Sequence, residues 1–283
     1  MSQANYDTIK DMIYKDSVSS ALDKMLAFEK ALTDDETSDL FINIIHKYWI
    51  DDKSNKAMEA INMLMKRKID IDTYSEALLY KGRLYMDSED YGSAIKEFNK
   101  AACKTKNDNL LARIYYDMSR CYYMIPKRNV SIKFAYKSIE HHKKHEETND
   151  QDICDNIETI IHNYLLMKKL KSAKLIYDEW VGKNASKANF LSNMHGYFGD
   201  YYFEAGIWDT ALSYYKLAYD MCDTTRQSTR GKYLLFMGDC YSKVGQVEKA
   251  LEAYKNSLQL LQEDKDDELF QYAYERIHKN RPK

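Results

Sequence analysis

The stretch Gly199–Cys222, GDYYFEAGIWDTALSYYKLAYDMC, decides the fold of this chain. Gly199 stands three residues before Tyr202, and Ala211 follows that tyrosine by nine residues. The stretches 238–258, GDCYSKVGQVEKALEAYKNSL, and 82–101, GRLYMDSEDYGSAIKEFNKA, keep the same spacing. Self-similarity at a fixed spacing is the mark of a repeat protein.

The tyrosine and the small residue that follows it recur six times. A small residue lets a second helix approach the first closely, and the tyrosine ring fills the groove beside it. A bulkier residue comes four positions later in five of the six cases, with Ala135 as the exception, so that one helix face is defined. Gly206 and Gly245 fall at the turn between helices, where the left-handed conformation favours glycine. The pattern predicts an all-α chain of six helical hairpins, built on Tyr48/Ala57, Tyr85/Ala94, Tyr122/Ser131, Tyr164/Ala173, Tyr202/Ala211 and Tyr241/Ala250.

The order Gly, Tyr, Ala, aromatic, Ala resembles the tetratricopeptide repeat (TPR). The resemblance covers about residues 38–261 and is best at Gly82, Gly199 and Gly238. The tyrosines are spaced 37, 37, 42, 38 and 39 residues apart, against about 34 in the family. The resemblance implies a right-handed superhelix, an α-solenoid with a concave inner surface.

Three segments are expected along the chain. Residues 1–37 would form an N-terminal helical cap, residues 38–261 the repeats, and residues 262–283 a capping helix with a basic tail. No independent second domain is predicted. The longest step between tyrosines contains Glu140–Asp152, EHHKKHEETNDQD, which we expect to be an exposed loop or a frayed helix end.

Composition narrows the classes of function. The formal net charge of −2 argues against a general affinity for nucleic acid or for an anionic membrane. Five cysteines without a CxxC pair indicate reduced thiols and a cytoplasmic protein. Neither a signal peptide nor a run of about 20 apolar residues is present.

Enzymatic motifs are absent from the sequence. It contains no P-loop, GxGxxG, GxSxG or HExxH motif, so we expect neither an enzyme nor a cofactor. His141 and His145 have the spacing of a helical metal pair, but the adjacent lysines indicate a solvated helix end and no metal site. The 25 tyrosines could suggest base stacking, yet the repeat register explains many of them as core residues.

The inner surface of the first helices is the expected ligand site. Numbering each hairpin with the glycine at position 8 and the tyrosine at position 11, positions 2, 5, 9 and 12 line the concave surface in the TPR family. A basic segment at Arg83 and Arg120, with Arg113 nearby, gives way to an acidic segment at Asp200 and Asp239. Arginines can hold carboxylates and acids can hold a cationic end, so an extended peptide is the expected ligand. The predicted ligand-binding residues are His46, Trp49, Arg83, Tyr116, Arg120, Tyr123, His162, Asp200, Phe203 and Asp239.

Two expectations accompany this groove. An arginine exposed in it would contribute little to folding, so that Arg83 and Arg120 could be replaced without loss of stability. The alternative is that the position-9 charges form ordinary ion pairs on one helix surface, such as Arg83 with Asp87.

The long-period, tyrosine-rich hairpins also resemble the sensor region of Gram-positive peptide-pheromone receptors of the Rap- and PlcR-like group. That resemblance implies a non-enzymatic protein that binds a peptide or protein segment, in particular a quorum-sensing receptor for a peptide pheromone that lacks a DNA-binding domain. Residues 1–37 are short for the DNA-binding or three-helix domains of that group, so either a truncated or effector-free member or an unrelated TPR adaptor is expected. A structural scaffold that assembles proteins through its convex face or ends, or forms a homodimer, remains the alternative.

Overall fold

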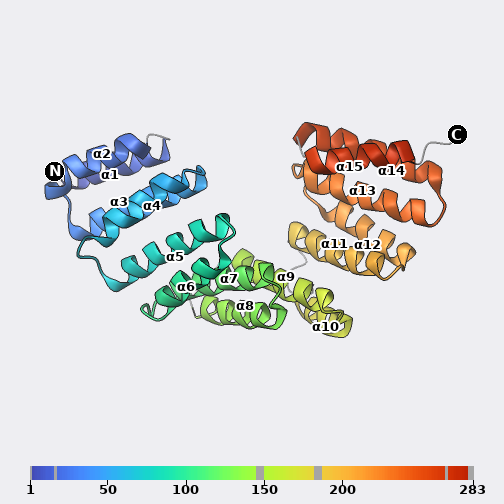
Figure 1. Cartoon of the computed structure of the whole chain (residues 1–283), viewed down its shortest axis with the longest axis horizontal. Coiled ribbons are helices and arrows are strands. Elements are labelled where there is room, and N and C mark those ends of the chain that lie inside the picture. Colours follow the sequence, from blue (N-terminus) through green and yellow to red (C-terminus); the bar gives the residue numbers. More distant parts are fainter. Residues whose placement is uncertain (1, 16–17, 145–149, 182–186, 265–266, 280–283) are drawn as a thin grey trace. The chain divides into compact units, whose positions relative to one another are not determined.

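The computed structural model describes residues 2–15, 18–144, 150–181, 187–264 and 267–279 (Figure 1). Within these ranges the regular structure consists of fifteen α-helices and one short 3-10 helix, without a strand. The all-α prediction is therefore confirmed. The chain forms two compact units, residues 1–156 and 157–283, and the boundary falls inside a helix. No break in the repeat pattern indicated this division.

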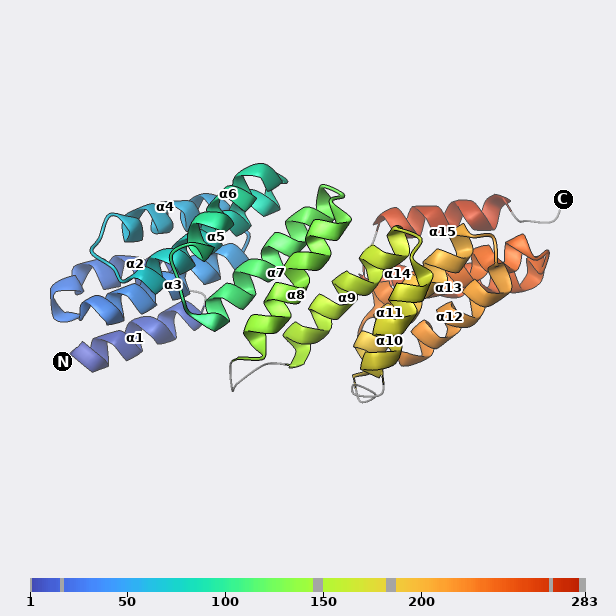
Figure 2. The same cartoon turned by 90° about the horizontal axis from the view of Figure 1, so that it is seen from below.

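The first unit is a series of antiparallel helix pairs, and in it consecutive helices lie side by side (Figures 1 and 2). It contains α1 (Ser2–Tyr14), α2 (Val18–Ala27), η1 (Glu29–Ala31), α3 (Asp34–Ile50), α4 (Ser54–Met65), α5 (Ile71–Asp87), α6 (Tyr91–Ala102), α7 (Asp108–Met124), α8 (Arg128–His142) and the first part of α9 (Asp150–Leu166).

The second unit continues the same arrangement. It contains the rest of α9, α10 (Leu170–Val181), α11 (Ala188–Glu204), α12 (Trp208–Met221), α13 (Gln227–Lys243), α14 (Val247–Asp264) and α15 (Asp267–Lys279).

The first repeat helix, α3, begins at Asp34 because Thr33 caps it. The Thr33 hydroxyl accepts a hydrogen bond from the Glu36 N–H at 3.1 Å, and the Glu36 carboxylate accepts one from the Thr33 N–H at 2.7 Å. This reciprocal capping box satisfies two backbone donors that would otherwise lack partners at the helix start.

Small residues sit between the paired helices, as predicted. A Cβ on Gly199 would lie 2.6 Å from the ring of Tyr215, so only glycine lets that ring pack here. In the third hairpin, Ala135 stands at the position that Tyr215 holds in the fifth. There the Ser131 hydroxyl donates a hydrogen bond to the Ser119 carbonyl at 2.8 Å. The six predicted small residues are all fully buried: Ala57, Ala94, Ser131, Ala173, Ala211 and Ala250.

The six hairpin turns share one backbone hydrogen bond. In each, the N–H five residues after the repeat tyrosine bonds to the carbonyl of that tyrosine, at 2.8–2.9 Å. In five of the turns this is the Schellman motif, with a left-handed residue four positions after the tyrosine. The third turn has Pro126 at that position, which has no N–H for the second bond of the motif. Gly206 has φ 73° and Gly245 has φ 77° there, but Asp52, Glu89 and Lys168 also take positive φ.

The segment predicted as an exposed loop is partly helical. α8 continues through His142, whose side chain is buried, and His141 Nδ1 lies 2.5 Å from Asp108 Oδ1. The expectation of a loop is therefore wrong for residues 140–142, which belong to α8, and for residues 150–152, which belong to α9. His145 and its neighbours up to residue 149 lie outside the described residues.

Within the described residue ranges, no helix has both the length and the apolar character that crossing a bilayer requires. No group of three or more His, Cys, Asp or Glu side chains in those ranges could hold a metal ion.

Candidate functional site

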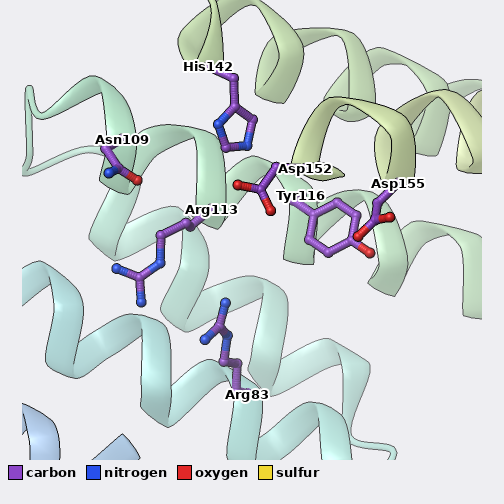
Figure 3. Close-up of a pocket in the computed structure, with 7 residues that line it drawn as sticks. All are labelled: Arg83, Asn109, Arg113, Tyr116, His142, Asp152 and Asp155. Atoms are coloured by element: carbon purple, nitrogen blue, oxygen red, sulfur yellow. The ribbon is translucent and has the colours of Figure 1, made fainter. Parts of the chain in front are cut away.

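A pocket of about 290 Å³ lies on the first unit, between the first helices of three successive hairpins (Figure 3). We call it the first-unit pocket. Basic side chains come from α5 and α7, acidic side chains come from the start of α9, and a histidine comes from the end of α8. Its lining residues are Arg83, Asn109, Arg113, Tyr116, His142, Asp152 and Asp155.

Arg83 is held in place on three sides. Its Nε donates to Asp117 Oδ2 at 2.6 Å, and its guanidinium lies 4.9 Å from the Trp49 ring centre and 5.5 Å from that of Tyr80. The Asp117 side chain is 2% exposed and that of Arg83 is 13% exposed. Arg83 is thus not the exposed arginine expected from the sequence, and it stabilises a buried carboxylate.

The predicted surface pair of Arg83 with Asp87 does not form. Asp87 Oδ2 instead accepts a hydrogen bond from Trp49 Nε1 at 2.6 Å. His46 completes this aromatic cluster, with its ring centre 5.9 Å from that of Trp49. Burial, and then the charge of Arg83, lower the pKa of His46. Trp49 therefore contacts Arg83, and His46 contacts Trp49, but neither ring lines the pocket.

Arg113 is fixed by the preceding hairpin. Its Nη1 donates to Glu76 Oε1 at 2.7 Å, and its Nη2 lies 3.5 Å from the Tyr80 hydroxyl. Both arginines of the pocket therefore have carboxylate partners, Asp117 and Glu76, from within the first unit.

The opposite wall is acidic. Gln151 Nε2 donates to Asp155 Oδ1 at 2.7 Å. Burial, and then the neighbouring charge of Asp152, raise the pKa of Asp155, although the bond from Gln151 acts in the opposite direction. Figure 3 shows the two aspartates across the pocket from Arg83 and Arg113. The pocket can therefore contact a polar ligand with donors on one wall and carboxylates on the other.

The remaining predicted residues of the first unit are more exposed. The Arg120 side chain is 51% exposed, 3.9 Å from Asp117 Oδ1, and lies above the Tyr116 ring at 5.9 Å. Tyr123 contacts Arg128, whose guanidinium lies 4.6 Å from the tyrosine ring centre. Tyr116 lines the pocket, whereas Arg120 and Tyr123 do not. Arg120 is adjacent to the pocket because it contacts the ring of Tyr116.

Three predicted residues of the second unit have contacts within it. His162 stacks on Tyr197 with ring centres 4.1 Å apart. Asp200 accepts a hydrogen bond from the Tyr215 hydroxyl at 2.7 Å, and burial raises its pKa. Phe203 is partly buried against the core formed by α12 and α13.

Asp239 is engaged inside the fold. It accepts hydrogen bonds from the hydroxyls of Tyr254 at 2.8 Å and Tyr272 at 3.1 Å, and it lies 3.1 Å from Arg276 Nε. The residue is 6% exposed. Asp239 therefore anchors the capping helix α15, and we leave it out of the proposed site.

The sequence analysis missed Asp152 and Asp155. Asp155 holds position 2 of the fourth first helix, three residues before Glu158, so the repeat numbering could have identified it. Asp152 was assigned to the exposed loop, although the N-cap residue types Thr148 and Asn149 could have marked Asp150 as the start of α9.

Comparisons with known proteins agree on the fold. No family model matches the chain, and no curated protein matches its sequence. A TPR repeat-containing protein from Cytophaga hutchinsonii is 14% identical with a TM-score of 0.58, over 94% of this chain and 98% of that one. The chain therefore has the TPR fold, an α-solenoid built from helical hairpins.

Two further solved structures are similar over nearly the whole chain. The apo form of RapI is 18% identical with a TM-score of 0.71, over 97% of this chain and 79% of that one. NprR in complex with its cognate peptide NprX is 14% identical with a TM-score of 0.60, over 98% and 81%. The TM-scores show that the fold is shared. At these sequence identities the likeness shows the fold alone.

Proposed function

We propose that this protein is a non-enzymatic receptor for a peptide or protein segment, and that the first-unit pocket is one of its contact points. The observation that carries the proposal is the convergence of Arg83, Arg113, Tyr116, Asp152 and Asp155 from successive first helices. Polar side chains held by their own partners form a pre-organised surface, which lowers the entropic cost of binding.

The class of ligand follows from the chemistry of the two walls. A peptide offers backbone N–H groups to carboxylates and backbone carbonyls to arginines, and its apolar side chains can contact Tyr116. The likeness to RapI and NprR supports a peptide ligand, and we propose a cytoplasmic peptide sensor in particular. NprR itself is recorded with its cognate peptide NprX.

Thermal denaturation with positional-scanning hexapeptide libraries tests this function. A ligand that binds the folded state alone raises the melting temperature, because it adds RT ln(1 + [L]/Kd) to the free energy of unfolding. We expect at least one library pool to stabilise the full chain in proportion to its concentration. If no pool does so while the chain is folded, the proposal fails.

The pocket assignment needs a matched pair of variants. Asp152→Asn removes a negative charge from the acidic wall of the first-unit pocket. Glu140→Gln removes a negative charge from an exposed side chain of α8 that pairs with Lys144, outside the pocket. We expect calorimetric titration to show about 10-fold or greater weakening for Asp152→Asn, from the loss of a charge-assisted contact, and none for Glu140→Gln. Equal affinities for the two variants would remove this pocket from the binding site.

A further inference from the structure

A second pocket, of about 240 Å³, lies on the second unit between α11 and the start of α13. We call it the second-unit pocket. One wall comes from α11 and the other from α13. Its lining residues are Asn193, Gly196, Tyr197, Asp200, Arg226, Thr229, Lys232 and Tyr233.

The base of this pocket is rigid. Tyr233 is 5% exposed, and its hydroxyl donates to the Ser192 carbonyl at 3.3 Å. A Cβ on Gly196 would lie 2.9 Å from the Tyr233 ring, so the ring and the α11 backbone are in close contact. Because the two helices are packed this tightly, side chains of the walls are held at a defined separation.

The side chain of Arg226 makes its hydrogen bonds to a neutral amide, although its positive charge also helps to lower the pKa of the nearby Asp223. Both of its Nη atoms lie 3.4 Å from Asn193 Oδ1, which belongs to a neutral amide. Asn193 in turn donates from Nδ2 to Glu158 at 3.0 Å, so the amide separates the guanidinium from that carboxylate. Among the described residues, Arg226 forms no ion pair.

Lys232 provides a second positive charge. Its Nζ lies 5.5 Å from the ring centre of Phe236, and it too forms no ion pair with a described residue. The pocket contains one carboxylate, Asp200, which is already bonded to the Tyr215 hydroxyl. Among the lining residues, two cations therefore face one carboxylate, whose pKa burial raises and the charge of Lys232 acts to lower.

We propose that the second-unit pocket binds a carboxylate of the peptide ligand, held by Arg226 and Lys232 with the Thr229 hydroxyl beside them. The inference rests on the proposed function and assigns the polarity of one of its contacts. The sequence had suggested the opposite polarity for this part of the chain, since Asp200 and Asp239 were expected to receive a cationic group. Arginine forms two parallel hydrogen bonds with a carboxylate, which gives geometric selectivity as well as attraction.

The test uses the hexapeptide that stabilises the full chain best in the library screen. Its affinity is measured by calorimetry for the wild type, for Arg226→Gln and for Lys232→Gln. Lys216→Gln is the matched control, because its Nζ also lies over an aromatic ring of the second unit, 5.7 Å from that of Tyr241, but outside the pocket. The peptide is also made with a C-terminal amide, and separately with each acidic side chain replaced by its amide.

We expect Arg226→Gln to weaken binding about 10- to 100-fold, since one charge-assisted bond is lost. Lys232→Gln should have a smaller effect and Lys216→Gln none. Removing the recognised carboxylate should weaken the wild type equally, and should have no further effect on Arg226→Gln. Which amide derivative does so identifies the C-terminus or a side chain as the source.

Two contrary outcomes are distinguishable. If the hexapeptide binds and Arg226→Gln behaves like Lys216→Gln, the carboxylate site is wrong and the proposed function stands. If no hexapeptide binds the folded wild type, the proposed function and the site that rests on it both fail.

Discussion

Arg83 donates to a buried carboxylate, whereas Arg120, at the same repeat position, extends into solvent. The difference lies in the partner: the Asp117 side chain is 2% exposed, and Arg83 Nε reaches it at 2.6 Å while Arg120 Nη1 stops at 3.9 Å. Removing one member of a buried ion pair leaves an uncompensated charge, which costs far more than the loss of a surface contact.

We predict that Arg83→Ala lowers the free energy of unfolding by about 3–5 kcal/mol. Arg120→Ala should change it by no more than about 0.5 kcal/mol. Urea denaturation of both variants measures the difference. The double variant Arg83→Ala/Asp117→Ala should regain part of the loss, because the unpaired carboxylate is gone. Similar stabilities for Arg83→Ala and Arg120→Ala would show that the buried pair contributes nothing.

His195 makes stability depend on pH. It is 5% exposed, its Nε2 lies 2.7 Å from the Tyr177 hydroxyl, and burial lowers its pKa. Above the ordinary histidine pKa of about 6.5 the imidazole is neutral in both the folded and the unfolded chain. As the pH falls through that value, only the unfolded chain binds the proton, so stability is lost from there down to the lowered folded-state pKa.

We therefore predict that stability falls as the pH drops below about 6.5, and that His195→Gln reduces the fall. Urea denaturation at pH 7.5 and pH 5.5 gives the two values for each protein. An identical pH dependence in the variant would mean that His195 titrates normally in the folded chain.

At the scale of the element, the hairpin turn is the repeated unit. Five of the six turns place a left-handed residue four positions after the tyrosine, and glycine occupies only two of these five positions, Gly206 and Gly245. The left-handed conformation costs a residue with a Cβ about 1–2 kcal/mol, and glycine avoids that cost. Glu89, at φ 61°, therefore destabilises its own turn.

We predict that Glu89→Gly raises the free energy of unfolding by about 0.5–1 kcal/mol. The variant removes the steric cost of the left-handed conformation, but glycine loses more conformational entropy on folding, so the gain is smaller than that steric cost. Gly206→Ala should lower it by about 1–2 kcal/mol. Ser88→Gly is the control, because Ser88 has negative φ at −86° and gains no relief from glycine. A stabilisation by Ser88→Gly equal to that by Glu89→Gly would rule out the backbone explanation.

At the scale of the whole molecule, each hairpin contacts mainly its neighbours along the chain, as in other repeat proteins. Overpacking one hairpin should therefore loosen that hairpin first. We predict that Ala211→Leu costs about 1–3 kcal/mol, because Ala211 is fully buried between paired helices.

Hydrogen exchange measured by mass spectrometry locates this effect. Exchange should accelerate in α11 and α12 and less in α14, which lies one hairpin further along the second unit. An unchanged melting temperature, or uniform acceleration over the second unit, would contradict the repeat description.

The hairpins could be predicted from the sequence because their signals are local. Tyr202 and Ala211 are nine residues apart, and the turn and packing that they determine lie within the same hairpin. The charges of the inner surface could not be predicted in the same way. Arg83 and Asp117 are 34 residues apart on different hairpins, and the repeat numbering gives the side on which a residue lies but not its partner.

The hydrogen bonds from Tyr215 to Asp200 and from Tyr254 to Asp239 have a consequence for protein design. In each case the second helix of a hairpin supplies the donor, and the acid 15 residues earlier on the first helix accepts it. A hairpin transplanted into another repeat array would carry the aspartate of its first helix together with the tyrosine hydroxyl that donates a hydrogen bond to it. Exchanging first helices alone would leave a buried phenol without its acceptor. For these two bonds the unit to transplant is the whole hairpin and not a single helix. The hairpin of Asp239 would have to keep α15 as well, because Tyr272 and Arg276 also contact that carboxylate.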